Sequence, residues 1–331
     1  MQGDLVSAVE TWKRAVATWP VEKRDASFAR WSASRAITSY WSGQYETGVE
    51  MGTEAHELGL EASNLEAAVV GASHAGLALV GLSRHEEGIS WLDRAIELGR
   101  EWEERSFRFT ARAMNMRAGA LREIGDMAAA RAQSEEALEL AKDSGFPPAA
   151  ISARLDLLYA DLMDGDIGRV ERLIPDLAEA IEDVKGFHLF LWSIRLLVAR
   201  AEAAVLAGRH DEAISFAKEA LDAAARFGRP KYDCLVRVPL ARALLATGRA
   251  KEAADVVTRA VIEAERLGHL PSRWRALAML ADAKADLGEN DAASDARAAA
   301  VRSVEEFANS LSEAHRSVLR SRPDVLALIA D

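Results

Sequence analysis

Two amphipathic segments flank one glycine in residues 201–228, AEAAVLAGRHDEAISFAKEALDAAARFG. Before Gly208, the apolar residues of 187–206 are spaced by three and four, as on one face of a helix. After Gly208, residues 211–227 repeat this pattern and end at Gly228, two residues before a proline, which is a common helix-end signal. This sequence predicts a helix, a tight turn, a second helix and then a longer turn.

The same turn signature recurs along the whole chain, in steps of 40, 40, 42, 40, 43, 40 and 40 residues. The signatures are Gly3-Asp4, Gly43-Gln44, Ser83-Arg84, Gly125-Asp126, Gly165-Asp166, Gly208-Arg209, Gly248-Arg249 and Gly288-Glu289. Three aligned columns, five and twelve residues after the first residue of each signature and seven before it, are almost entirely Ala or Gly. A period of this length indicates a repeat array, and small residues allow neighbouring helices to approach closely.

Small residues in these columns around a glycine turn resemble tetratricopeptide repeats. The resemblance implies an all-α fold, a right-handed α-solenoid of about eight helix–turn–helix units in a single domain over 1–331. The units are anchored near 3, 43, 83, 125, 165, 208, 248 and 288, and a C-terminal cap is expected at 310–331. The usual unit has 34 residues, so the surplus should lengthen the helices or the turn between units. Long units of this kind are similar to the C-terminal arrays of LuxR-type and maltose-activator-type ATPase regulators and of multidomain bacterial nucleotide cyclases.

The first unit is only half present, because the helix expected over Asp4 to Trp19 has no preceding partner helix. Alone, this helix would expose Val9, Trp12 and Val16. We therefore expect the chain to be cut from a larger protein, or to begin at an internal Met. The alternatives are that this helix is itself a cap, or that it pairs with a second subunit in a dimer.

The unit around Gly165 departs from the pattern. Its three small positions are Leu158, Val170 and Leu177, and Pro175 falls inside its second helix, where proline removes a backbone hydrogen bond. Either this unit has simply diverged, or it is a hinge or binding niche.

The composition excludes several classes of protein. A net charge of −11 argues against a general binder of nucleic acid or of anionic membranes. The single cysteine, Cys234, excludes an intrachain disulfide and is expected to be a buried, inert thiol. No apolar run approaches the length of a membrane span, and the N-terminus lacks the pattern of a signal peptide. These features predict a cytoplasmic protein.

The sequence carries no signature of catalysis. Its seven histidines show no metal-ligand spacing, and no GxSxG motif is present. Gly71 to Gly76, GASHAG, lacks the Gly-Lys-Ser/Thr of a phosphate loop and falls inside a predicted helix. We therefore expect no catalytic residue, no cofactor and no metal.

In the resembling arrays, the first helices of successive units line a concave groove. Arginine recurs there thirteen residues before the signature, and other polar or aromatic residues lie nearby. The predicted partner-binding residues are Arg30, Tyr40, Trp41, Arg112, Asn115, Arg122, Tyr159, Arg195, Glu202, Arg242 and Arg275, with Asp282 as a further candidate. Because the arginine fork matches carboxylates and phosphates, an acidic peptide or a chain terminus is the expected ligand. Alternatively, these arginines pair with acidic residues of neighbouring units.

Arg105, Arg108, Arg112, Arg117 and Arg122 make one segment locally basic. They wind around more than one helical face, so they are a weak signal for nucleic acid, and a solvated or paired role is expected.

Three functions remain open. The first is a non-catalytic scaffold for protein–protein interaction, as the C-terminal part of a larger bacterial signalling or transcriptional-regulator protein. The second is a sensor of a peptide or small ligand that uses the groove. The third is a fragment of an enzyme, such as a nucleotide cyclase, whose catalytic domain lies elsewhere.

Overall fold

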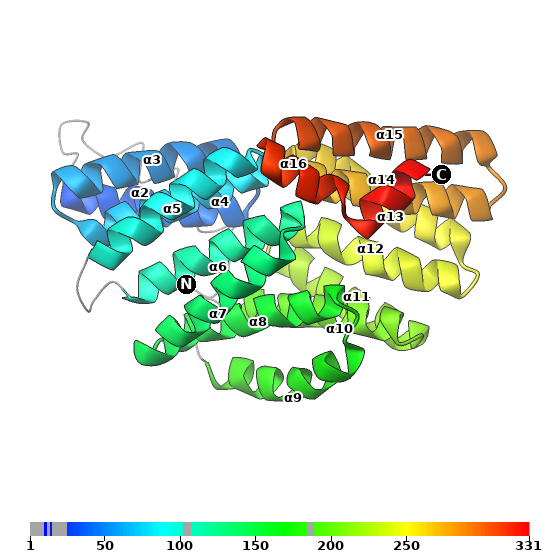
Figure 1. Ribbon diagram of the computed structural model, residues 1–331, viewed down its shortest axis with the longest axis horizontal. Coiled ribbons are helices and arrows are strands. Elements are labelled where there is room, and N and C mark those ends of the chain that lie inside the picture. The colour runs from blue at the N-terminus through cyan, green and yellow to red at the C-terminus, as the bar shows by residue number, and fades with distance from the viewer. Residues whose placement is uncertain (1–9, 12–13, 15–24, 102–106, 185–188, 331) are drawn as a thin grey trace. The chain divides into compact units, whose positions relative to one another are not determined.

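The computed structural model of the chain describes residues 10–11, 14, 25–101, 107–184 and 189–330. These residues form helices joined by short turns, and no strand occurs among them (Figure 1). The helices are α2 (Ala26–Trp41), α3 (Tyr45–Glu61), α4 (Leu65–Gly81), α5 (His85–Glu101), α6 (Phe107–Ile124), α7 (Met127–Asp143), α8 (Pro147–Met163), α9 (Ile167–Asp183), α10 (Leu189–Leu206), α11 (His210–Arg226), α12 (Pro230–Ala246), α13 (Ala250–Leu267), α14 (Leu270–Asp286), α15 (Asn290–Asn309), α16 (Glu313–Arg320) and α17 (Pro323–Ala330). The predicted all-α repeat fold is confirmed. The half unit expected over Asp4 to Trp19 lies outside the described residues, apart from three helical positions.

The turns between consecutive helices repeat at half the predicted period. In each described turn from α2 to α15, one residue has a positive φ, between 53° and 108°. These residues are Gly43, Ser63, Ser83, Gly125, Gly145, Gly165, Gly208, Gly228, Gly248, Gly268 and Gly288. Within each uninterrupted run they are 20 residues apart. Glycine favours this left-handed geometry because it has no Cβ.

The turn between units is therefore no longer than the turn within a unit. Residues 42–44 join α2 to α3, and residues 62–64 join α3 to α4. The expected longer turn is thus absent here, and the surplus over a 34-residue unit lies in the helices. Helices α2 to α15 have 16 to 20 residues each.

By contacts, the chain divides into two compact bodies. The first body is Met1–Arg122, Met127–Leu157 and Val184–His188, and the second is Glu123–Asp126, Leu158–Asp183 and Leu189–Asp331. The boundary passes through α6 and α8, so each body holds a stack of consecutive helices. A single domain over 1–331 stays a prediction.

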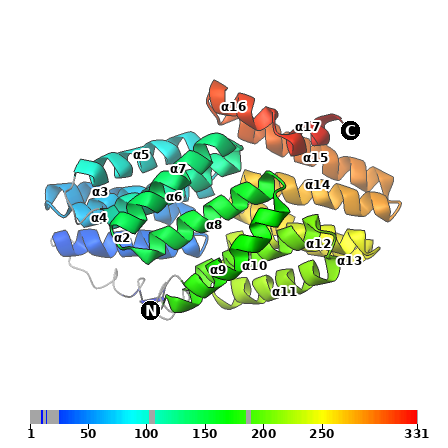
Figure 2. The same cartoon turned by 60° about the horizontal axis from the view of Figure 1, so that its bottom comes forward.

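In the first body, glycines bring helix backbones into contact. A Cβ on Gly52 of α3 would lie 2.7 Å from the carbonyl oxygen of Gly71 on α4. A Cβ on Gly76 would lie 2.7 Å from the carbonyl oxygen of Gly88 on α5. The glycines of the GASHAG segment are therefore helix-packing residues, and α2 to α5 lie side by side (Figure 2).

In the second body, the predicted small columns form the helix interfaces. Ala213 and Ala220 of α11, Ala241 of α12, and Ala253 and Ala260 of α13 are all fully buried. Each helix packs on the next, and the first helices α10, α12 and α14 also contact one another. The small columns thus set the spacing between helices, as the sequence predicts.

The irregular unit keeps its helices despite its larger residues. Leu158, Val170 and Leu177 are fully buried, and α9 runs through Pro175 without a break. Pro175 is exposed, so the carbonyl that its missing N–H leaves free can face water.

The C-terminal cap forms as predicted. Ser312 caps α16 by accepting a hydrogen bond from the backbone N–H of His315. Directly before α17, the buried Arg322 donates two hydrogen bonds to the Asp324 carboxylate and one to the carbonyl oxygen of Glu123. Arg322 thereby fastens the tail onto the second body.

None of the described helices combines the length and apolar character that crossing a bilayer requires.

Candidate functional site

One face of α6 carries a row of polar residues, which we call the α6 row. Arg108, Arg112, Asn115, Gly119 and Arg122 are spaced by four, three, four and three residues, so they lie on one side of the helix. The sequence predicts Arg112, Asn115 and Arg122 as groove residues, and the structure brings them onto one surface in the first body.

Three arginines of the basic segment therefore lie on one face of α6, whereas the sequence analysis expects the segment to wind around more than one face. Arg108, Arg112 and Arg122 share the α6 row, whereas Arg117 points elsewhere and pairs with Asp93 at 2.6 Å. Arg105 lies outside the described residues. The expected paired role is thus met by Arg117 and also by two members of the row, since Arg108 pairs with Glu66 and Arg122 with Asp156.

Two members of the α6 row tie α6 to α8. The Asn115 amide donates to the carbonyl oxygen of Ala149 at 3.0 Å, and its Oδ1 is buried with no hydrogen-bond partner among the described residues. Arg122 pairs with the buried Asp156 at 2.7 Å. Arg122 therefore follows the alternative prediction, in which an arginine binds an acidic residue of the neighbouring unit.

Arg112 is half-buried, and burial lowers the pKa of its guanidinium to about 10. At neutral pH it remains charged. Burial, together with the Arg112 charge, lowers the pKa of His74 on α4 to about 4, although a hydrogen bond to the Val70 carbonyl opposes the shift. At neutral pH Arg112 is therefore charged and His74 is neutral.

Gly119 leaves the centre of the α6 row open. A Cβ at this position would meet no heavy atom within 4 Å. Its φ is not in the left-handed region, so the backbone does not require glycine here. The glycine therefore provides space between Asn115 and Arg122.

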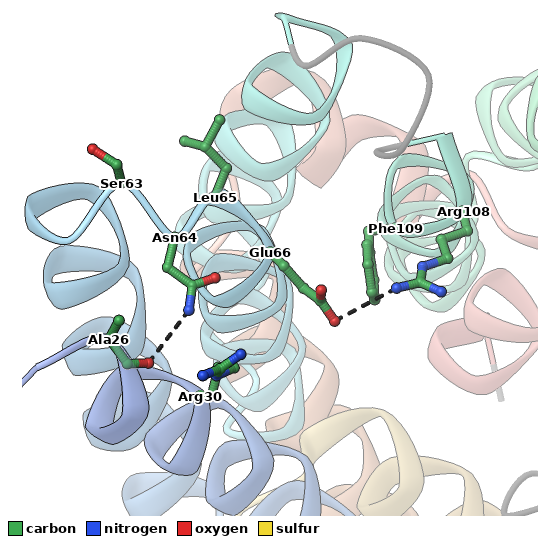
Figure 3. Close-up of a pocket in the computed structure, with 8 residues that line it drawn as sticks. All are labelled: Ala26, Arg30, Ser63, Asn64, Leu65, Glu66, Arg108 and Phe109. Carbon is green, nitrogen blue, oxygen red and sulfur yellow. Dashed lines mark hydrogen bonds and ion pairs between the residues drawn. The ribbon is translucent and has the colours of Figure 1, made fainter.

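A cavity of about 650 Å³ lies at the starts of α2, α4 and α6 in the first body. Its lining residues are Ala26, Arg30, Ser63, Asn64, Leu65, Glu66, Arg108 and Phe109. Figure 3 shows Arg108 and Glu66 directed toward each other, with Arg30 on the opposite side of Glu66. The cavity thus begins at Arg108, one helical turn before Arg112 in the α6 row.

Most of the predicted partner-binding residues in the second body already contact other residues of that body. Tyr159 donates to the backbone carbonyl of Arg195 at 2.8 Å, and the Arg195 guanidinium lies 5.8 Å from the Tyr159 ring centre. Glu202 and Arg242 pair at 3.0 Å between α10 and α12. These contacts again join neighbouring units.

Arg275 and Asp282 are also engaged. Arg275 donates to the carbonyl of Pro271 and lies 4.8 Å from the Trp274 ring centre. Asp282 faces Arg297 at 3.4 Å.

Two of the three predicted aromatic groove residues, Tyr40 and Trp41, belong to the first body, and Tyr40 is buried there. Its ring packs against Trp41 at 4.7 Å and against Tyr45 at 5.5 Å between ring centres. Trp41 is partly buried. Together these rings close the interface between α2 and α3.

Glu66 and Phe109 line the cavity but are not among the site residues predicted from the sequence. A signal existed for Glu66, because Glu66 and Arg108 each stand seventeen residues before a turn signature. Extending the aligned columns by one helical turn would therefore have placed these two residues opposite each other.

Cys234 is a buried free thiol, and burial raises its pKa to about 12. This matches the inert thiol predicted from the sequence. Within the described part of the chain, no cluster of three metal-binding side chains is found.

Comparisons with known proteins address the fold. The profile of the tetratricopeptide repeat matches residues 111–144, and no curated protein matches the chain. A Rap protein complexed with competence and sporulation factor has a TM-score of 0.65 at 14% identity, over 86% of this chain and 77% of that one. The Rap conjugation gene regulator of plasmid pLS20, in complex with the Phr* peptide, has a TM-score of 0.66 at 12% identity, over 86% and 76%. The chain is therefore an array of tetratricopeptide-type helical repeats.

Proposed function

We propose that this chain is a protein-interaction module that binds an extended peptide segment along the α6 row. The observation that carries the proposal is the open space at Gly119, which lies between hydrogen-bonding side chains on one helix face. A ligand backbone can approach closely where no Cβ projects. Arg112 and Asn115 then offer donors on one side of that space, and Arg122 offers a donor on the other.

Two structures of the same fold support a peptide ligand over a purely structural role. Both Rap proteins were captured with a bound factor or peptide. We further propose a cytoplasmic regulatory setting, as part of a larger signalling protein. In that setting, binding of a peptide at the α6 row would regulate the other domains of the larger protein.

Selection from a displayed library of random 12-residue peptides tests this proposal. Peptides that bind the wild-type chain are expected to lose binding to Gly119→Leu, because leucine fills the open space without a backbone clash. Gly168→Leu on α9 is the matched control, since a Cβ there meets nothing closer than 3.5 Å and Gly168 belongs to the second body.

Arg112→Ala should weaken the same peptides by about tenfold, the value of one hydrogen bond to a charged group. If no peptide is selected, or if selected peptides bind Gly119→Leu unchanged, the α6 row is not the binding surface.

A further inference from the structure

The turn between α6 and α7 differs from the other signature turns. It consists of two residues, Gly125 and Asp126, whereas the other signature turns in the described part of the chain have three. Gly125 has a φ of 108°, while the other five signature glycines that the structure describes have values between 72° and 76°. This turn therefore has a geometry of its own, and the contacts around it should account for the difference.

The side chain of Arg322 fills the space beside Gly125. A Cβ on Gly125 would lie 2.6 Å from the Cδ of Arg322 and 2.8 Å from its Cγ, whereas a Cβ on Gly208 would meet nothing within 4 Å. The guanidinium of Arg322 donates to the carbonyl oxygen of Glu123 at 3.1 Å, across 199 residues of sequence. Arg322 therefore packs against the turn and bonds to the backbone that enters it.

The carboxylate of Glu123 is held by other residues. Lys231, at the start of α12, lies 2.7 Å from this carboxylate, and Nε2 of His269, at the start of α14, lies 3.2 Å from it. Both residues belong to the second body, as do Glu123 and Arg322. The side chain of Glu123 is thus anchored independently of Arg322, so what Arg322 controls is the backbone of the turn.

Residues 321–330, which we call the tail, can leave the turn as a unit. Two of the three hydrogen bonds from the Arg322 guanidinium go to Asp324 inside the tail, so the two opposite charges leave together. Helix α17 has eight residues, too few for a stable isolated helix. It lies on α15 and buries Leu328, but Leu326 remains 54% exposed (Figure 2). Release of the tail therefore leaves no unpaired arginine or carboxylate of the tail in the second body.

We propose that the tail is a releasable latch that sets the conformation of the turn between α6 and α7. When the tail is docked, Arg322 holds Gly125 at a φ of 108°. When the tail is released, the turn relaxes toward the geometry of the other signature turns. Arg122, the last residue of the α6 row, is followed directly by Glu123. The latch therefore also controls the end of the peptide surface, a consequence that rests on the proposed function.

Hydrogen exchange of the full chain, followed by mass spectrometry, tests whether the tail controls the turn. Arg322→Ala removes the contact with the turn and should speed exchange in residues 121–128 by about tenfold. Leu328→Ala loosens α17 but leaves Arg322 intact, and it should speed exchange in the same residues. Arg320→Ala is the matched control, because Arg320 pairs with Glu305 on the surface at 2.6 Å and should leave the turn unchanged.

The reverse direction has its own pair of variants, because coupling between two sites is reciprocal. Gly125→Ala places a Cβ against Arg322 and should speed exchange in residues 323–330 by about tenfold. Gly165→Ala is the control, since it puts alanine at a similar positive φ where a Cβ meets nothing within 4 Å. Exchange in α17 should remain as in the wild type.

Helix α11 shows whether the second body stays folded, and its exchange should not change in any of these variants. A turn that exchanges as in the wild type in both Arg322→Ala and Leu328→Ala overturns the latch. Faster exchange that extends to α11 also overturns it, because it indicates general unfolding.

Peptides selected for binding to the α6 row give a separate measurement. Arg322→Ala should bind them about fivefold more weakly, and Arg320→Ala should bind them like the wild type. Unchanged peptide affinity together with faster exchange in the turn would keep the latch and refute its control of the peptide surface. Failure of the peptide selection would refute the proposed function, and hydrogen exchange alone would then decide the latch.

Discussion

Gly119 and Gly208 have different backbone conformations, so the same substitution should change stability in opposite directions. Gly119 lies within α6 and Gly208 has a φ of 72° in a turn, and neither would bring a Cβ within 4 Å of another atom. Gly119→Ala should raise the free energy of unfolding by about 0.5–1 kcal/mol, because it restricts the unfolded chain and favours helix. Gly208→Ala should lower it by about 1 kcal/mol, because alanine is strained at positive φ. Urea unfolding of both variants measures the two signs, and equal signs would contradict this account.

His74 should make the first body sensitive to acid. The lowered pKa of about 4 lies below the ordinary value of 6.5, so between these pH values the unfolded chain binds a proton that the folded chain does not. Stability from this residue is intact above pH 6.5 and is lost progressively as the pH falls toward 4. The integrated effect is about 3 kcal/mol. The His74 ring already donates from Nδ1 to the carbonyl of Val70, and its buried Nε2 has no hydrogen-bond partner among the described residues.

Urea unfolding of the wild type and of His74→Leu, followed from pH 7 to pH 4, isolates this contribution. The carboxylates titrate in both chains, so their effects cancel in the difference. The wild type should lose more stability than the variant on acidification. Parallel pH profiles would show that His74 does not titrate in this range.

At the scale of elements, α9 tests whether the irregular unit is a weak point. Pro175 is exposed in α9, whereas Pro239 is buried in α12. Pro175→Ala should raise the free energy of unfolding by about 2 kcal/mol, since it restores a backbone hydrogen bond without loss of packing. Pro239→Ala should gain less, because it also removes a buried ring.

Hydrogen exchange then separates the two interpretations of this unit. If α9 is a hinge, its amides should exchange faster than those of α11 in the wild type, and Pro175→Ala should slow them. Equal protection of α9 and α11 would contradict the hinge interpretation and would indicate that this unit has only diverged in sequence.

The helices were predictable because their signals are local. The apolar spacing, and a glycine at every signature except Ser83-Arg84, each lie within about twenty residues of sequence. The turns between units were harder to predict. Their positive-φ residues are Ser63, Gly145, Gly228 and Gly268, and the residue type that follows them varies. The left-handed backbone, rather than the residue that follows, is what the turns share.

The pairing of the groove arginines was not predictable from the sequence. Arg122 and Arg242 bind carboxylates of neighbouring units, whereas Arg30 has no ion pair among the described residues. All three belong to first helices with similar patterns. What differs is the side chain that the next helix places opposite, and this depends on packing between units. The sequence therefore predicted that these arginines lie on first helices but not which of them form ion pairs.

At the scale of the whole molecule, an array of repeats should lose stability locally. Each helix packs mainly on its neighbours, so a defect should propagate only through adjacent interfaces. Gly52→Ala places a Cβ against backbone atoms of α4, and Ala260→Leu overfills a fully buried position in α13. Each should cost about 1–3 kcal/mol in the body that contains it. Native-state hydrogen exchange should show α2 to α5 losing protection in Gly52→Ala while α12 to α14 keep it, and the reverse pattern in Ala260→Leu. If either variant lowered protection throughout the described chain, the two bodies would have to unfold as one cooperative unit.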